Sequence, residues 1–256
     1  MIAVLLCAGY ATRLYPLTQN FPKPLLPVAE KPVIDYLVDQ IDELPEIDFL
    51  HIVTNDKFFK HFDSWAAQKN KSGTTSIPII VHNDGTSCNA NRLGAVADLH
   101  FVLKGLRTNQ PMLVSAADNV FRFPIEKIWR DFLSGSCHLV VAMPEKDPAK
   151  LQRTGVLELN DKDRVLRLHE KPGIPPSTWS CPPLYFLKPS ARKHLETLMA
   201  TETSLDAPGH FIDYLCRREH VAAHKLNGSR LDIGDAGSYH IADQRLRREP
   251  LFIQSK

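Results

Sequence analysis

The chain has 256 residues, of which 43% are hydrophobic and 23% charged, ordinary values for a folded protein. Its formal net charge is +2 at pH 7, and no lysine and arginine run is flanked by aromatic residues, so we expect no nucleic-acid partner. No apolar stretch reaches the roughly 18 residues of a membrane span. Five scattered cysteines without a C-x-x-C spacing favour reduced thiols. The sequence therefore indicates a cytoplasmic protein without a disulfide framework or zinc site.

Short apolar runs alternate with helix-length amphipathic segments along the first half of the chain. The four strands expected there are nearly continuous apolar runs, which is typical of strands covered by helices on both faces. Their alternation with helices predicts a mostly parallel, doubly wound sheet. The expected strands are 2–6, 49–55, 77–83 and 111–117, and the expected helices are 32–44, 57–70, 92–106 and 125–134.

The second half of the chain has shorter strand patterns. The run LELNDKDRVLRL predicts a hairpin that turns at Asp161, Lys162 and Asp163. No linker or internal repeat interrupts the sequence, so we expect one domain over residues 1–256. The fold class is then α/β, a three-layer α/β/α sandwich with a mixed, mostly parallel Rossmann-like sheet. The further strands expected are 138–143, 155–159 and 182–187, and the further helices are 190–200, 210–218 and 236–247.

The loop after the first strand carries the first chemical signal. It contains Gly9, Arg13 and Lys23, and a proline lies on either side of that lysine. Ligands of open α/β sheets bind beyond the carboxyl ends of the strands, where this loop lies. A glycine lets backbone amides approach an anion, an arginine offers a bidentate fork and a lysine a point charge, so the loop predicts phosphate binding. It contains neither a Walker A motif nor a G-x-G-x-x-G motif.

The run AGYATRLYPLTQNFPKPLLPV at 8–28 resembles the signature of the sugar-phosphate nucleotidyltransferases, the family of glucose-1-phosphate thymidylyl- and uridylyltransferases. The resemblance extends to about Arg247 and implies this family's reaction. An acceptor phosphate oxygen would attack the α-phosphorus of a nucleoside triphosphate, and pyrophosphate would leave. Shorter matches follow the first one, namely NRLGAV at 91–96, ADN at 117–119, TGVLEL at 154–159, HEKP at 169–172, DAPGHFI at 206–212 and LDIGD at 231–235.

The resemblance implies catalytic and metal-binding roles for five residues. Arg13 would hold the β- and γ-phosphates, and Lys23 would lie at the reacting phosphates. Lys171 would hold the phosphate of the acceptor. Asp118 and Asp232 would bind Mg²⁺ or Mn²⁺, which prefer hard oxygen ligands.

The resemblance also implies a nucleotide-binding half at about 1–125 and an acceptor-binding half at about 126–247. In the second half Glu170 would bind sugar hydroxyls, and Gly155 would let the acceptor approach the backbone. Asn83 lies in an N-D-G run and is equally typical of a turn. The residues expected to contact the nucleotide are Leu6, Ala8, Gly9, Asn83, Arg92 and Gly94.

Three features of the sequence depart from the family pattern. Ala117 replaces the usual glycine before the first metal aspartate, and Arg230 replaces a common tryptophan before the second. Pro182 and Pro183 interrupt a strand, and because proline cannot donate a ladder hydrogen bond, we expect this strand to be edge-like or bulged. The departures affect the acceptor side more than the nucleotide side.

The leading interpretation is a metal-dependent nucleotidyltransferase that joins a nucleoside triphosphate to a sugar 1-phosphate. One alternative is a cytidylyltransferase for a small non-sugar phosphate or phosphonate, such as phosphocholine. Another is a non-catalytic regulator that binds nucleotide sugars, which the full set of cations and carboxylates argues against. Glu170 favours an acceptor with hydroxyl groups. The base stays open, and a homo-oligomer is compatible with the sequence.

Overall fold

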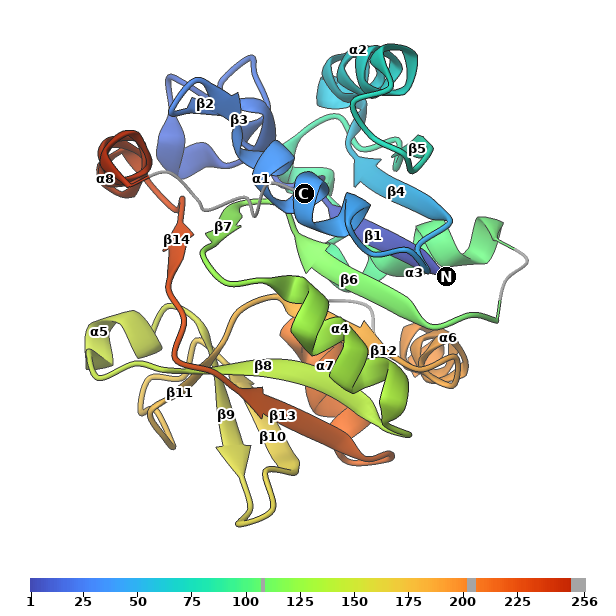
Figure 1. The fold of residues 1–256 in the computed structure, drawn as a ribbon, viewed down its shortest axis with the longest axis vertical. Helices are drawn as coiled ribbons and strands as arrows, with labels where there is room; N and C mark the ends of the chain where they lie inside the picture. Colours follow the sequence, from blue (N-terminus) through green and yellow to red (C-terminus); the bar gives the residue numbers. More distant parts are fainter. Residues whose placement is uncertain (107–108, 202–205, 250–256) are drawn as a thin grey trace.

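The computed structural model describes residues 1–106, 109–201 and 206–249, and its centre is a ten-stranded mixed sheet (Figure 1). The strands of this sheet are β1 (Ile2–Leu6), β4 (Phe49–Thr54), β5 (Ile79–Asn83), β6 (Met112–Ala116), β8 (His138–Pro144), β9 (Gly155–Leu159), β10 (Val165–Glu170), β11 (Trp179–Cys181), β12 (Leu184–Leu187) and β13 (Val221–Lys225). Their order is β10-β9-β11-β8-β12-β6-β1-β4-β5, and β13 pairs with β8.

The two halves of the sheet differ in strand direction. Strands β6, β1, β4 and β5 are parallel, as their continuous apolar runs predict. Strands β12, β11, β9 and β10 pair antiparallel with their neighbours, and β9 and β10 form the predicted hairpin, with Asp163 in the turn at φ 59°. Strand β13 is parallel to β8.

Helices cover both faces of the sheet, which confirms the three-layer α/β/α class. One face packs against α1 (Val33–Asp42), α2 (Asp56–Ser72) and α4 (Ile125–Ser134). The other face packs against α3 (Ala95–Gly105), α6 (Ala191–Thr201) and α7 (Gly209–Cys216). Side chains alternate along β1, so Leu5 joins the first core and Val4 the second.

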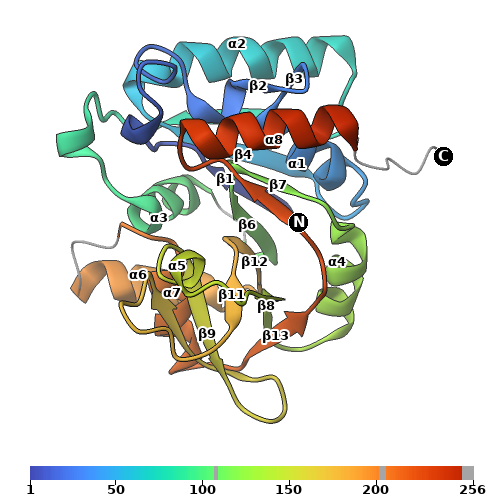
Figure 2. The same ribbon diagram turned by 90° about the vertical axis from the view of Figure 1, so that its left-hand side faces the viewer.

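Helix α8 (Ala236–Arg248) lies outside these layers and closes a third, smaller core (Figure 2). The short pairs β2 (Pro27–Val28) with β3 (Lys31–Pro32) and β7 (Asn119–Phe121) with β14 (Arg230–Asp232) lie beside it. In this core Leu14 and Val28 pack with Val120, Ile233 and Leu246. The core therefore fastens the loop after β1 to the β7–β14 pair. The remaining elements are α5 (Pro148–Leu151) and the 3₁₀ turns Thr12–Leu14, Lys23–Leu25 and Asn89–Asn91.

The chain is bulged at the two prolines, as one of the two alternatives predicted. The other alternative, an edge strand, is wrong. Strand β12 lies between β6 and β8, and the prolines lie in the gap between β11 and β12. The pairing with β8 shifts between Ser180 and Tyr185, which makes the gap a bulge. The Pro183 carbonyl accepts hydrogen bonds from the Ser115 hydroxyl at 2.7 Å and the Ala116 amide at 3.1 Å. The missing proline N–H groups therefore break no ladder.

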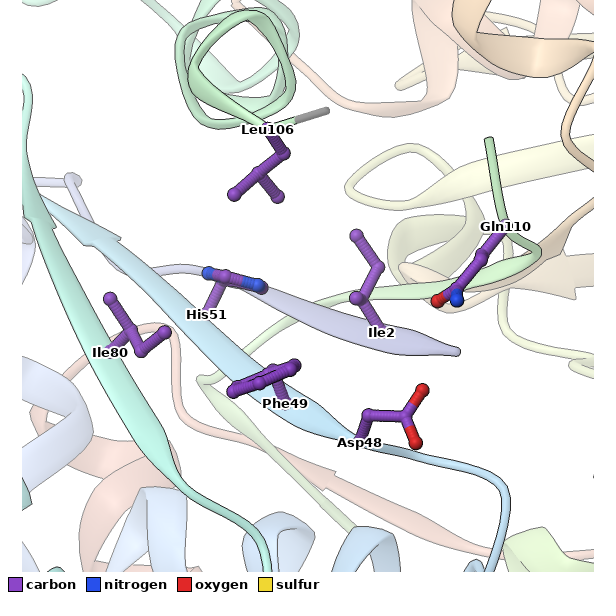
Figure 3. Close-up of a pocket in the computed structure, with 7 residues that line it drawn as sticks. All are labelled: Ile2, Asp48, Phe49, His51, Ile80, Leu106 and Gln110. Atoms are coloured by element: carbon purple, nitrogen blue, oxygen red, sulfur yellow. The ribbon is translucent and has the colours of Figure 1, made fainter. Parts of the chain in front are cut away.

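A cavity of about 340 Å³ lies on one face of the sheet, near the amino ends of β1 and β4 (Figure 3). Phe49, His51 and Ile80 line it with other side chains. A second cavity, of about 1080 Å³, lies among α1, α4 and α8. Neither cavity is lined by a predicted site residue. Among the described residues, no helix has the length and apolarity needed to cross a membrane.

Candidate active site

The loop after β1 presents a run of backbone amides. Within the described residues, the N–H groups of residues 8–13 have no hydrogen-bond acceptor. The loop is held through its carbonyls instead, because Asn55 Nδ2 donates to Ala8 O at 2.9 Å and Thr18 Oγ1 to Ala11 O at 2.8 Å. A Cβ on Gly9 would meet nothing within 4 Å. Such a run of free amides is suited to binding an anion.

Lys23 connects this loop to two distant parts of the chain. Its Nζ donates to Asp118 Oδ2 at 2.6 Å and to the carbonyl oxygen of Ile233 at 2.9 Å. The side chain is only 13% exposed, so the ion pair is largely shielded from water. The structure therefore brings the proline-bracketed lysine and the first predicted metal carboxylate together.

The β7–β14 pair brings the two predicted metal carboxylates close to each other. Asp232 pairs with Asn119 in the ladder, and the Ile233 amide donates to the Asp118 carbonyl at 3.1 Å. Burial opposes ionisation of Asp118, but the charge and hydrogen bond of Lys23 outweigh it and lower the pKa of that carboxyl. Loss of hydration and the neighbouring charge of Asp118 raise the pKa of Asp232.

This pair has the donor chemistry of a Mg²⁺ or Mn²⁺ site that is completed by substrate. Asp118 and Asp232 offer carboxylate oxygens, and the electrostatic conflict between them is one that a bound cation relieves. No group of three or more histidine, cysteine, aspartate or glutamate side chains suited to a metal occurs within the described ranges. The protein would therefore contribute two carboxylates and leave positions for water and phosphate oxygens.

Arg13 lies in the loop after β1, where its side chain is exposed. Its side chain makes no hydrogen bond or ion pair with any described residue. Its positive charge nevertheless favours the ionised forms of Asp232 and Asp235. Arg13 is thus an available cation next to the carboxylate pair.

The predicted acceptor residues lie at the end of β10. Glu170 Oε1 accepts a hydrogen bond from the Gly209 amide at 2.9 Å, and burial raises the pKa of this carboxyl. Lys171 follows at φ 46° with an exposed side chain, and its amide donates to Thr154 O at 3.1 Å. A Cβ on Gly155 would lie 3.3 Å from the Cys181 carbonyl oxygen, so close packing with β11 accounts for this glycine.

Asn83, which was expected to contact the base, is occupied in a turn. Its Nδ2 donates to Asp56 Oδ1 at 2.8 Å, and its Oδ1 accepts from the Gly85 amide at 2.9 Å. Both ends of the amide group are therefore used within the fold, as the N-D-G alternative predicts. Leu6 ends β1, so its backbone lies at the start of the loop that was predicted to bind phosphate.

Arg92 and Gly94 lie just before α3, which begins at Ala95 rather than at residue 92. Gly94 has a φ of 94°, which is outside the helical range and ends the preceding loop. The Arg92 guanidinium donates to both carboxylate oxygens of Asp206 at 3.0 Å, and the Ala95 amide donates to Asp206 O at 3.1 Å. The first helical amide is thus already bound within the protein.

Beneath the β5–α3 loop lies a carboxyl pair that the motifs did not indicate. Asp98 is 5% exposed, and burial together with the neighbouring charge of Asp84 raises its pKa to about 8. The Asp84 Oδ1 atom accepts hydrogen bonds from the amide and hydroxyl of Thr86, whereas Asp84 Oδ2 and Asp98 Oδ1 find no donor among the described side chains. A single proton held between the two carboxyls satisfies this arrangement.

The site also includes residues to which the sequence analysis had assigned no role. Asn119 Nδ2 donates to Asp118 Oδ1 at 2.8 Å, and Arg230 donates to both Asn119 and Thr154. Gly209 orients Glu170, and a Cβ there would lie only 2.0 Å from the carboxylate oxygen. Each of these residues lies in or next to a recognised motif, which was the only sequence signal for them.

Comparison with known proteins gives consistent results across sequence and structure. The bifunctional protein GlmU of Methanococcus aeolicus is 28% identical over 242 residues, covering 91% of this chain and 51% of that protein. The chain therefore spans about half the length of that relative. The UTP–glucose-1-phosphate uridylyltransferase AglF of Haloferax volcanii is 26% identical, with 97% and 98% of the two chains covered.

Solved structures show the same fold. A putative glucose-1-phosphate thymidylyltransferase from Bacillus anthracis superposes with a TM-score of 0.82 at 20% identity, covering 96% of this chain and 95% of that one. A UDP-glucose pyrophosphorylase complexed with UDP-glucose gives 0.80 at 20% identity, covering 97% and 99%. The sequence profile of the family described as nucleotidyl transferase matches residues 2–249. The chain therefore belongs to the nucleotidyl transferase family.

Proposed function

We propose that this protein joins a nucleoside triphosphate to a sugar 1-phosphate, which yields a nucleotide sugar and pyrophosphate. The observation that carries the proposal is the Lys23–Asp118 ion pair beside Asp232. It lies next to a loop of free amides, and hydrogen bonds through Asn119 and Arg230 lead from it to the acceptor side. The names of relatives with the same fold support this class of reaction.

The first step is to bring two anionic substrates together. The amides of residues 8–13 and the free guanidinium of Arg13 would bind the triphosphate, and Lys171 would bind the acceptor phosphate. An acceptor oxygen then attacks the α-phosphorus, and the bond from this phosphorus to the bridging oxygen breaks. That oxygen leaves with the electron pair as part of pyrophosphate. Positioning and charge stabilisation supply most of the catalysis in such transfers.

Asp118 and Asp232 would hold Mg²⁺ or Mn²⁺. When bound, the ion neutralises phosphate charge and orients the phosphate oxygens. Lys23 keeps Asp118 ionised and fixes its position, because it donates to both Asp118 and the Ile233 carbonyl. The Gly209 amide fixes one oxygen of Glu170 and leaves the other oxygen for hydroxyl groups of a sugar.

The test is release of pyrophosphate by the purified protein with Mg²⁺. CTP, UTP, dTTP, ATP and GTP are each combined with glucose, mannose and N-acetylglucosamine 1-phosphates, phosphocholine and 2-aminoethylphosphonate. The proposal expects the best turnover with a sugar 1-phosphate, and near loss of that turnover in Lys23→Ala. Preference for phosphocholine or the phosphonate would instead favour the non-sugar alternative. Binding of nucleotide sugars without any turnover would favour a regulator.

A further inference from the structure

Arg230 lies between the two halves of the site and contacts both. It is the first residue of β14, two positions before Asp232. Its guanidinium donates to Asn119 Oδ1 at 2.8 Å on the nucleotide side and to Thr154 Oγ1 at 3.0 Å on the acceptor side. Asn119 is itself buried and hydrogen-bonded to Asp118. The guanidinium is therefore held in one position by two neutral partners.

The fold leaves most of the hydrogen-bonding capacity of Arg230 unused. A guanidinium has five N–H donors, and two of them are used by Asn119 and Thr154, which leaves three. In the described part of the chain no carboxylate lies within ion-pair distance of it. Arginine is otherwise the side chain best suited to bidentate binding of phosphate or carboxylate groups. The arrangement is that of an anion receptor.

The charge of Arg230 acts in two directions. It favours the ionised forms of Asp118 and Asp232. It also opposes the rise in pKa that burial causes in Cys181 and Tyr185, beside the proline bulge. Thr154, which anchors the guanidinium, also binds the Lys171 amide through its carbonyl oxygen. Arg230 and Lys171 are therefore held from the same residue, on the side of the site that is assigned to the acceptor.

We propose that Arg230 binds the phosphate group of the acceptor and, with Lys171, forms a two-cation clamp that sets specificity for a dianionic phosphoryl or phosphonyl group. This inference rests on the proposed function. The clamp would hold the attacking oxygen towards the α-phosphorus and would not contact the leaving pyrophosphate. Arg230 thus serves acceptor binding, whereas Arg13 and Lys23 serve the triphosphate.

The kinetic test compares Arg230→Gln, which keeps the size and a hydrogen-bond donor, with Arg230→Lys, which keeps the charge. We expect kcat/KM for the acceptor to fall by on the order of 10²–10³ in Arg230→Gln, while the KM for the triphosphate stays within about threefold. In Arg230→Lys, kcat/KM for the acceptor should be about tenfold higher than in Arg230→Gln. Added guanidinium ion should partly restore Arg230→Ala. An equal rise in both KM values would overturn the proposal, as would a loss that neither lysine nor guanidinium restores.

Arg122→Gln is the matched control, because Arg122 also belongs to the β7–β14 region but pairs with Glu249 away from the site. We expect its acceptor kcat/KM to stay within about twofold of the wild-type value. A loss in Arg122→Gln as large as in Arg230→Gln would assign the effect to the strand pair rather than to a phosphate contact, and would overturn the proposal.

Calorimetry separates this proposal from the proposed function. Protein saturated with Mg²⁺ and an α,β-methylene analogue of UTP, dTTP or CTP is titrated with glucose 1-phosphate and with phosphocholine. Binding of either phosphate to the wild type, weakened at least thirtyfold (about 2 kcal/mol) in Arg230→Gln, supports the clamp. Binding of phosphocholine alone would contradict the sugar acceptor but not the clamp. Unchanged binding in Arg230→Gln, or no binding of either phosphate to the wild type, would overturn the clamp.

Discussion

The proposed nucleotide half and the proposed acceptor half hold their charged side chains in different ways. In the nucleotide half Lys23 is pinned by two hydrogen bonds and is 13% exposed. In the acceptor half Lys171 is exposed, and the position of its backbone is fixed instead, through Thr154 and a φ of 46°. Glu170 is positioned by the amide of a helix that lies 39 residues further along the chain.

This difference indicates which changes each half tolerates. A pinned lysine loses little entropy when the substrate binds, and its environment is set before the substrate arrives. An exposed lysine on a fixed backbone can follow acceptors of different shape. The nucleotide half should therefore respond sharply to the loss of charge, whereas the acceptor half should respond to shifts of backbone and neighbouring groups.

The largest effect is expected from removing the metal. Excess EDTA should abolish pyrophosphate release, and added Mg²⁺ should restore it, because Asp118 and Asp232 face phosphate charge that lysine alone does not balance. Asp232→Asn should weaken Mn²⁺ binding, measured by electron paramagnetic resonance, and impair turnover severely. Asp235→Asn is the control. Asparagine keeps an oxygen that can accept from the Ser238 amide at the start of α8, so both stability and metal dependence should persist.

The second largest effect on turnover is expected from removing a cation from the nucleotide half. Lys23→Ala and Arg13→Ala should each lower turnover by on the order of 10²–10³, measured as pyrophosphate release. Their stabilities should differ. Lys23→Ala leaves Asp118 half-buried without its partner and should lower the melting temperature. Arg13 has no partner within the described fold, so Arg13→Ala should leave the melting temperature unchanged. Near-native turnover in either variant would exclude the phosphate-loop role for that residue.

A smaller effect is expected from displacing Glu170 in the acceptor half. In Gly209→Ala the new methyl group would lie 2.0 Å from Glu170 Oε1 and 2.6 Å from Leu168 Cδ2, so the carboxylate must move. We expect the acceptor KM to rise about tenfold, or by about 1.4 kcal/mol, with little change for the triphosphate. Gly173→Ala is the control, because a Cβ there meets nothing within 4 Å. Equal effects of the two substitutions would contradict the role of Gly209.

The smallest effect concerns pH, in a part of the nucleotide half away from the charged site. His51 Nδ1 and His82 Nε2 lie 2.9 Å apart, and burial lowers the pKa of His51 to about 4 and also lowers that of His82. Because the unfolded chain takes up these protons near pH 6.5 and the folded chain does not, stability should decrease as the pH falls from about 6.5 towards 4. The loss from His51 should be about 1 kcal/mol at pH 5.5.

Urea unfolding at pH 7.5 and pH 5.5 measures this dependence. His51→Gln should reduce the difference in unfolding free energy between the two pH values, whatever its effect at pH 7.5. An unchanged difference would show that the histidine pair does not titrate in this way. The acceptor half holds a similar group, because burial also lowers the pKa of His138, although its hydrogen bond to Glu219 opposes that shift.

Local pattern was sufficient for much of this protein. Continuous apolar runs identified the four parallel strands, and the expected helices agree with the structure to within a few residues. The glycine, arginine and proline-bracketed lysine after β1 indicated phosphate binding from their chemistry alone. These features could be predicted because neighbouring residues generate them: burial on both faces sets a strand's composition, and a loop's charges are visible without knowing its partners.

Only the tertiary structure decided how the two halves are joined. Strands β7 and β14 have three residues each, too few to show a period, and their pairing unites Asp118 and Asp232. Arg230 reaches Asn119 across 111 residues, a contact that no local pattern encodes. From sequence, Arg230 was only an exception to a family pattern. The fold makes it a guanidinium with fixed position and free donors, because long-range pairing determines what surrounds a side chain.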